Sequence, residues 1–340
     1  MDHKYILLGI ITLLFSLSLH SQDTFSIVAI DSVTGEIGSA GASCVGYSAY
    51  YPHGAAILSD VIPGIGAIHT QAAWLAANQN YAHSLMVLGL SPQQIIDSLV
   101  AHDAQNNPTT RQYGIVDYNN GHPRAASYTG INCMNYKNDT NNIYYSIQGN
   151  ILLGQLVLDS MQNRFLSTPG PLAERLMATL QGAKMLGADT RCAAHNSSSL
   201  SAFLRVALPS DPADSLYCDL YMAYSQNFAG FVPVDPIDSL QTLYDLWKMT
   251  TPVEKAGPSF PLKVWASSGK VITFDFSRCP VFTGMEIEVF DFTGRLISQR
   301  QVLKKNEVIY LPGIYSHGIC LYRIIKEDKK EIARGKILIK

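Results

Sequence analysis

The sequence predicts a mixed α+β chain, in which antiparallel sheets carry helices on their outer faces, followed by a small all-β module. Between residues 24 and 250, strands, a pair of helices, further strands and a last helix follow one another, an order typical of layered α+β domains. After residue 261 the helical periodicity ends and short strands remain. The chain has 340 residues, 47% hydrophobic and 15% charged, which suits large buried sheets better than a helical bundle.

The first 22 residues have the pattern of a removable leader. Lys4 precedes an apolar run from residue 5 to 19, which is short for a membrane span and typical of a signal-peptide core. We expect cleavage near residues 20–22, with Gln22 as a possible new N-terminus. No later segment is long and apolar enough to span a bilayer, so the mature protein is expected to be exported and soluble.

The first strand after the leader begins at Thr24. Residues 25–30 form a short, mostly apolar run, residues 31–35 supply turn chemistry, and residues 36–42 read as the returning strand of a hairpin. The small residues between Gly38 and Ala42 would let another backbone or a ligand come close. A hydroxyl residue at the start of a buried strand, near a processed N-terminus, is how an N-terminal nucleophile is presented. The alternative is that Thr24 only begins a strand.

Later elements follow from turn and capping signals. Ser91, Pro92 and Gln94 form a capping box and an N1 proline, so a helix is expected from residue 92. Asn119–Gly121 is typical of a hairpin turn. We expect further strands at 67–71, 112–117, 124–129, 144–148, 199–208 and 217–224, and helices at 151–165, 171–186 and 235–247.

The C-terminal part reads as a separate β module. Residues 251–261 contain three prolines and a glycine and form the expected linker. Residues 262–340 then form a predicted β-sandwich of a size at which such modules fold alone. Its strands are expected at 271–276, 286–290, 295–302, 307–311, 319–325 and 332–339, many with alternating apolar and polar residues. The predicted domains are thus a leader at 1–22, a first domain at 23–250, and this module after the linker.

Charge and cysteine content narrow the function classes. A formal net charge of -2 without a basic run gives no electrostatic case for nucleic acid as a partner. The six cysteines permit disulfides in an exported protein, but the sequence does not fix their pairing. Cys279 and Cys320 both lie in the C-terminal module and are one candidate pair, with free buried thiols as the alternative. No metal motif or nucleotide fingerprint occurs, so no cofactor is expected.

Nine short segments of the first domain, in their order and spacing, carry a family resemblance. They are Thr24–Asp31 with Thr34–Gly38, Gly64–Ala67 with Thr70–Gln71, Arg111–Asp117, Tyr128–Gly130, Gln148–Leu152, Leu172–Leu176 and Asp189–Arg191. Through them the domain resembles the family known as domain of unknown function 1028, which is grouped with the N-terminal-nucleophile (Ntn) hydrolases. The resemblance covers nearly all of residues 24–250 and implies a four-layer α/β/β/α Ntn-hydrolase-like sandwich.

Three segments of the C-terminal module carry a second resemblance: Val289–Gly294, Gly318–Tyr322 and Gly335–Lys340. Through them the module is similar to the sorting domain of type IX secretion substrates. A generic adhesive β-sandwich is the alternative. The resemblance implies the type IX secretion machinery as a partner, translocation across the outer membrane after Sec export, and a final place in the medium or on the cell surface.

The Ntn resemblance implies that Thr24 attacks an amide carbonyl while its own α-amine acts as base. The geometry requires Thr24 to be the first residue, yet Gln22 and Asp23 precede it after the expected leader cleavage, so further trimming is needed. His69, Asp189 and Arg191 are the other candidate catalytic residues. The alternatives are a hydrogen-bonded strand histidine for His69 and a structural ion pair for Asp189 with Arg191.

Three more polar residues are candidates for substrate binding. Ser43 ends the second strand near Thr24, although no nucleophile-elbow motif surrounds it. Gln148 and Asn150 could donate to an oxyanion, and turn chemistry explains Asn150 equally well. Two functions therefore stay open: a secreted Ntn-type hydrolase of an amide bond with an unknown substrate, and a non-catalytic module that binds a peptide or glycan.

Overall fold

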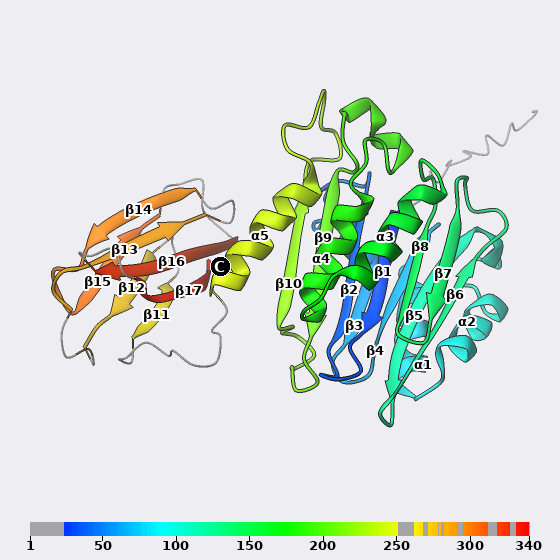
Figure 1. Ribbon diagram of the computed structural model, residues 1–340, viewed down its shortest axis with the longest axis horizontal. Coiled ribbons are helices and arrows are strands. Elements are labelled where there is room, and N and C mark those ends of the chain that lie inside the picture. The colour runs from blue at the N-terminus through cyan, green and yellow to red at the C-terminus, as the bar shows by residue number, and fades with distance from the viewer. Residues whose placement is uncertain are drawn as a thin grey trace, which may run out of the picture.

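The computed structural model describes residues 24–250, 262–267, 271–277, 279, 282–291, 295–311, 318–326 and 331–339. The predicted leader at 1–22 and the linker at 251–261 lie outside the described residues. Figure 1 shows the helices together with two sheets in the first part of the chain, and strands alone after residue 262. The expected mixture of helices and antiparallel sheets is confirmed.

The larger sheet of the first part has six strands, and every neighbouring pair is antiparallel. All seven residues of its central strand β1 are buried, as its apolar sequence predicts. In spatial order the strands are β10 (Cys218–Ala223), β9 (Ser201–Ala207), β2 (Ile37–Ser43), β1 (Thr24–Ile30), β8 (Tyr145–Gly149) and β7 (Asn138–Asn142).

The smaller sheet has four antiparallel strands. The predicted hairpin at residues 119–121 is confirmed, since Asn119 pairs with His122 across it. In spatial order the strands are β3 (Ser59–Ile62), β4 (Gly66–Ala72), β5 (Arg111–Asn119) and β6 (His122–Thr129).

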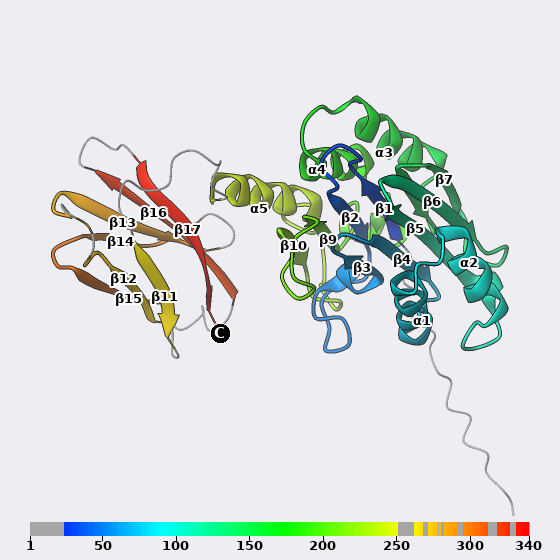
Figure 2. The same ribbon diagram turned by 90° about the horizontal axis from the view of Figure 1, so that it is seen from below.

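Side-chain alternation along β1 places the two sheets face to face. Phe25 and Ile27 pack into the core beneath α3 (Gln155–Ser167), α4 (Leu172–Ala183) and α5 (Pro236–Thr250). Val28 and Ile30 point the other way, into a core shared with the smaller sheet. Helices α1 (Ala76–Val87) and α2 (Pro92–Ala101) cover the far face of that sheet. In Figure 2, α3 and α4 lie on one side of the sheets and α1 on the other.

The helix predictions differ in accuracy for clear reasons. Helix α2 begins where predicted, because the Ser91–Gln94 capping box is formed on both sides. Helix α1 was not predicted, since its apolar residues do not gather on one helical face. The start predicted for α3 at residue 151 is wrong: Ile151 has a φ of 54°, and residues 150–153 bond to neighbouring segments before the helix begins at Gln155.

The small residues of β2 serve packing. A Cβ at Gly38 would lie 2.5 Å from Leu176 Cδ1 of α4, and a Cβ at Gly41 would lie 2.8 Å from the Phe203 ring. Both contacts are far too short for a real Cβ. The close approach expected at these glycines is therefore made by a helix and a neighbouring strand.

The C-terminal module forms two antiparallel sheets around one apolar core. Of the two alternatives for Cys279 and Cys320, the disulfide is wrong and the buried free thiols are what the structure shows. The predicted turn at 292–294 lies outside the described residues. The strands are β11 (Lys263–Ser267), β12 (Val271–Asp275) and β15 (Asn306–Tyr310) in one sheet, and β14 (Leu296–Gln301), β13 (Met285–Phe290), β16 (Gly318–Lys326) and β17 (Glu331–Ile339) in the other.

Short 3-10 helices join the elements, and the two used below are η1 (Gly54–Leu58) and η3 (Thr190–His195); a third, η2, covers Pro108–Thr110. Within the ranges that the structure describes, no helix combines the length and apolar character needed to cross a membrane.

Candidate functional site

Strand pairing brings three hydroxyl residues into one row at the end of the larger sheet. Thr24 pairs with Ser43, and Ser43 pairs with Ser201. All three are fully buried. Residues directly opposite each other in an antiparallel pair point to the same face, and Thr24 shares that face with Ser26, two residues further along β1. The row therefore faces the smaller sheet at one end of the interface between the sheets.

The main chain of Thr24 is fixed by two side-chain amides. Its nitrogen donates to Asn150 Oδ1 over 3.3 Å, and its carbonyl oxygen accepts from the Asn150 main-chain nitrogen over 3.1 Å. Gln71 Nε2, from β4 of the other sheet, also donates to this carbonyl over 3.3 Å. Asn150 thus fixes the main chain of Thr24 at both its nitrogen and its carbonyl oxygen.

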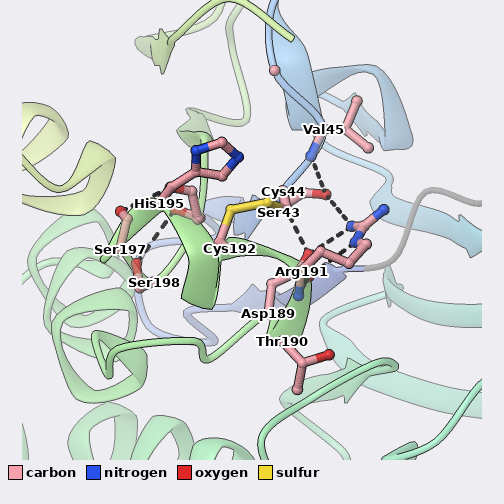
Figure 3. Close-up of a disulfide and its surroundings, with 12 residues drawn as sticks. Ser43, Cys44, Val45, Asp189, Thr190, Arg191, Cys192, His195, Ser197 and Ser198 are labelled. Carbon is pink, nitrogen blue, oxygen red and sulfur yellow. Dashed lines mark hydrogen bonds and ion pairs between the residues drawn. A yellow bond between two sulfur atoms is a disulfide. The ribbon is translucent and has the colours of Figure 1, made fainter. Parts of the chain in front are cut away.

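An acid–base pair lies beside Ser43. Asp189 is fully buried, and Arg191 donates to both of its carboxylate oxygens, at 3.0 Å from Nε and 2.6 Å from Nη2. The Cys44 main-chain nitrogen also donates to Asp189, over 2.8 Å. Arg191 Nη2 lies 3.5 Å from Ser43 Oγ. Figure 3 shows the guanidinium between the Asp189 carboxylate and Ser43, and its side chain is 32% exposed, so it carries a positive charge to the surface.

A disulfide fixes this pair against β2. Cys44, next to Ser43, is bonded to Cys192, next to Arg191, across 148 positions of sequence. Asp189 in turn caps η3 by accepting from the Arg191 main-chain nitrogen over 3.2 Å. Closing so long a loop restricts the unfolded chain and contributes about 2–5 kcal/mol to stability. The covalent link keeps Arg191 beside the end of β2.

We name the residues gathered here the strand-end cluster: Thr24, Ser43, Asn150, Asp189 and Arg191. These five are among the residues that the sequence singled out, and the tertiary structure brings them together. The remaining two, His69 and Gln148, lie elsewhere, in a second group of polar side chains further along the strands.

The second group fills part of the space between the sheets, and we name it the inter-sheet polar layer. Its centre is His69, whose Nε2 lies 2.6 Å from Ser39 Oγ and whose Nδ1 lies 2.9 Å from Ser26 Oγ. Ser26 donates to Gln71 Oε1 over 2.6 Å and accepts from Gln148 Nε2 over 2.7 Å. Its members are Ser26, Ser39, His69, Gln71 and Gln148, all at most 1% exposed.

His69 and Gln148 are saturated by these contacts. Burial, with a smaller contribution from the Arg205 charge, lowers the pKa of His69 from its ordinary 6.5 to about 3, so the ring is neutral at physiological pH. Gln148 also accepts from Ser146 over 2.8 Å, and a Cβ at Gly114 would lie 2.0 Å from its Oε1. Of the two alternatives for His69, its geometry supports the hydrogen-bonded strand histidine over the catalytic residue.

Sequence reasoning missed the partners that link the two groups. Gln71 bonds both Ser26 and the Thr24 carbonyl, and its Nε2 also donates to Gln112 Oε1 over 2.7 Å. The available signal was alternation: Ser26 lies two residues after Thr24, and Gln71 two after His69, so each pair shares a face. Among the described residues, no group of three or more His, Cys, Asp and Glu side chains is arranged to hold a metal ion.

Comparison with known proteins concerns the first domain. The family described as "Family of unknown function (DUF1028)" matches residues 24–227, more than half of the chain. A crystal structure of a Silicibacter pomeroyi protein described under the same family has a TM-score of 0.52 and 24% identity, and the match covers 68% of this chain and 91% of that one. Its likeness to the present chain is one of fold. No curated protein matches. The chain belongs to the Family of unknown function (DUF1028).

Proposed function

We propose that the first domain is an Ntn-type hydrolase that cleaves an amide bond, with Thr24 as the nucleophile once the residues before it are removed. The observation that carries the proposal is the placement of Thr24: it opens the central strand, and its nitrogen is bound by Asn150. It also pairs with Ser43, beside which the partly exposed Arg191 lies. The order of helices, sheet, sheet and helices also supports it, because Ntn hydrolases have such a sandwich.

In the proposed reaction the Thr24 hydroxyl oxygen attacks the substrate carbonyl carbon, and its proton passes to the Thr24 α-amine. An α-amine titrates near pH 8, so a useful fraction is neutral at neutral pH. The proton then moves to the leaving nitrogen as the amide C–N bond breaks, which leaves an ester on Thr24. Water then adds to this ester: the α-amine takes a proton from the water and passes it to the Thr24 oxygen as the C–O bond breaks and the acid is released.

The other members of the strand-end cluster have supporting roles in this proposal. Asn150 Oδ1 accepts from the nitrogen that becomes the α-amine, and so fixes the base beside its own hydroxyl. The Arg191 guanidinium brings positive charge to the side of Ser43, where it can stabilise negative charge that develops on the substrate. Asp189 holds that guanidinium through two hydrogen bonds. His69 has no part in the chemistry, since it is buried and neutral.

We also propose that the protein is exported and that the C-terminal β-sandwich is the sorting module, removed after outer-membrane translocation. The two termini of the secreted form therefore test both proposals together. The intact mass of protein recovered from the medium is expected to match a chain that starts at Thr24 and ends before residue 262. Retention of the β-sandwich would contradict the sorting proposal alone.

A start at Gln22 or Asp23 would rule out α-amine catalysis, and the non-catalytic peptide- or glycan-binding module would then be the better description. A β-lactone electrophile, which acylates hydroxyl nucleophiles, supplies the direct test of chemistry. We expect the trimmed protein to gain one probe mass at Thr24, Thr24→Ser to retain labelling, and Thr24→Ala to lose at least about a thousandfold in labelling rate. Equal labelling of Thr24→Ala would overturn the nucleophile assignment.

A further inference from the structure

We propose that a second site, separate from the strand-end cluster, binds a free apolar α-amino acid as its zwitterion. The site is a pocket of about 350 Å³, at the small end of the range for small-molecule sites. Its walls come from η1 and the residues before it, β3, α1 and β9. Arg205, Asp60, His83 and His53 supply its charged and titratable groups.

The pocket lies well away from Thr24. Arg205 pairs with Ser39, and Ser39 pairs with Val28. That row is four residues along the strands from the row of Thr24, Ser43 and Ser201, which corresponds to about 13 Å at 3.3 Å per residue. The inference is therefore independent of the proposed Thr24 chemistry, and either can fail alone.

The Arg205 side chain is fixed by hydrogen bonds from Nε and Nη1, and its Nη2 stays available to a ligand. Its Nε donates to Asp219 Oδ1 over 3.0 Å, and its Nη1 donates to the Ser59 carbonyl over 2.9 Å and to the Ala56 carbonyl over 3.4 Å. Within the part of the chain that the structure describes, Nη2 has no hydrogen-bond partner. Because the side chain of Arg205 is already fixed, its guanidinium can donate to a bound carboxylate with little further loss of conformational entropy.

A simple anion would be poorly matched to this pocket, because a carboxylate also lines it. Asp60 Oδ2 accepts from His83 Nδ1 over 2.7 Å, while its other oxygen has no partner among the described residues. Burial, together with the Arg205 charge, lowers the pKa of His53, so His53 adds little positive charge. The Arg205 guanidinium is paired on one side with Asp219, and the Asp60 carboxylate is paired on one side with His83. Both line the same small pocket, and together they match a ligand with both a carboxylate and an ammonium group.

The apolar residues of the lining favour a ligand with an apolar side chain. Pro52, Ala56 and Ile57 are the apolar residues of the lining, and the Ala56 carbonyl contacts the Arg205 guanidinium. An aliphatic side chain on the carbon between the ammonium and the carboxylate would lie against this apolar surface, and its removal from water would strengthen binding. L-leucine has the required combination of groups.

Titration calorimetry with three matched compounds tests the inference. L-leucine carries both charges, 4-methylpentanoate is leucine without the ammonium, and 3-methylbutylamine is leucine without the carboxylate. We expect the full chain to bind L-leucine at least about tenfold more tightly than either analogue, because each analogue lacks the charge-assisted hydrogen bonds that one of the two charged groups makes. Absence of L-leucine binding up to about 10 mM, or equal binding of 4-methylpentanoate, would overturn the proposal.

Two variants locate the binding. Asp60→Asn keeps the shape of the side chain and removes its charge, and is expected to weaken L-leucine binding by about tenfold or more. The control Asp97→Asn removes an exposed carboxylate on α2 that bonds Gln93 and should bind L-leucine as the unmodified chain does. Matching thermal unfolding curves verify that both variants are folded. Equal losses in the two variants, or none in Asp60→Asn, would contradict the assignment.

Discussion

The inter-sheet polar layer and the strand-end cluster are built on the same strands, yet they differ in what their polar groups are bonded to. In the layer, side chains bond mainly to one another: His69 reaches Ser39 and Ser26, and Ser26 reaches Gln71. In the cluster, side chains bond to main-chain nitrogens at strand and helix ends, as Asn150 does to Thr24 and Asp189 does to Cys44. Only the cluster carries a charge to the surface, through the partly exposed Arg191.

This difference teaches how to read a polar residue in a buried strand. Hydrogen-bonded polar side chains between two sheets satisfy one another and fix the register of the sheets, so their removal should affect stability. Polar groups at strand ends lie where the chain turns and where solvent can approach, so their removal should affect binding or chemistry. The three predictions below test the structural half of this comparison, from the largest expected effect to the smallest.

The largest effect is expected for His69→Ala. The change leaves a cavity and removes one hydrogen-bond partner each from Ser39 and Ser26, so the free energy of unfolding should fall by about 3–5 kcal/mol. Urea unfolding followed by circular dichroism measures it. His122→Ala, which removes an exposed histidine at the start of β6, is the matched control and should change stability by less than about 0.5 kcal/mol. A similar small change for His69→Ala would show that the layer is not structural.

Lowering the pH from 6 to 4 is expected to reduce the free energy of unfolding by less than the loss of the His69 side chain does. Burial holds the pKa of His69 at about 3 in the folded protein, whereas the unfolded chain takes up the proton near pH 6.5. The contribution to stability is therefore complete above pH 6.5 and is lost as the pH falls toward 3, by about 1.4 kcal/mol per unit between pH 6 and 4. The stability advantage of the unmodified chain over His69→Gln should shrink accordingly. A pH-independent difference between the two would contradict this.

The smallest effect is expected one residue further along β4. Thr70 alternates with His69 and faces away from the polar layer, toward the apolar core under α1 and α2. Its side chain is buried, and its hydroxyl has no hydrogen-bond partner in the described part of the chain. Thr70→Val should leave stability unchanged or raise it by about 1 kcal/mol, because it removes an unsatisfied polar group. A loss above about 1 kcal/mol in thermal unfolding would mean that the hydroxyl is bonded after all.

Much of the fold was predictable from local signals. The strand at residues 25–30, the hairpin at 119–121 and the capped helix after Ser91 depend on residues close together in sequence, and all three occur as expected. Helix α1 was not predicted, because its apolar residues are spread around the helix and do not lie along one face. The start of α3 was misplaced because residues 150–153 bond to segments distant in sequence, such as Met134 and Ala188.

For the site, the sequence by itself determined which residue types open and close the strands: Thr24 at the start of β1, Ser43 at the end of β2, and Asp189 with Arg191 after a helix. The tertiary structure alone decided which of them meet. Arg191 lies beside Ser43 because the Cys44–Cys192 disulfide joins segments 148 positions apart. His69 belongs to the inter-sheet polar layer, where its two ring nitrogens bond Ser39 and Ser26. Hydrogen bonds act over about 3 Å, so strand register and sheet packing determine which polar side chains become partners. Both depend on contacts between segments that are distant in sequence, and so neither can be predicted from one segment alone.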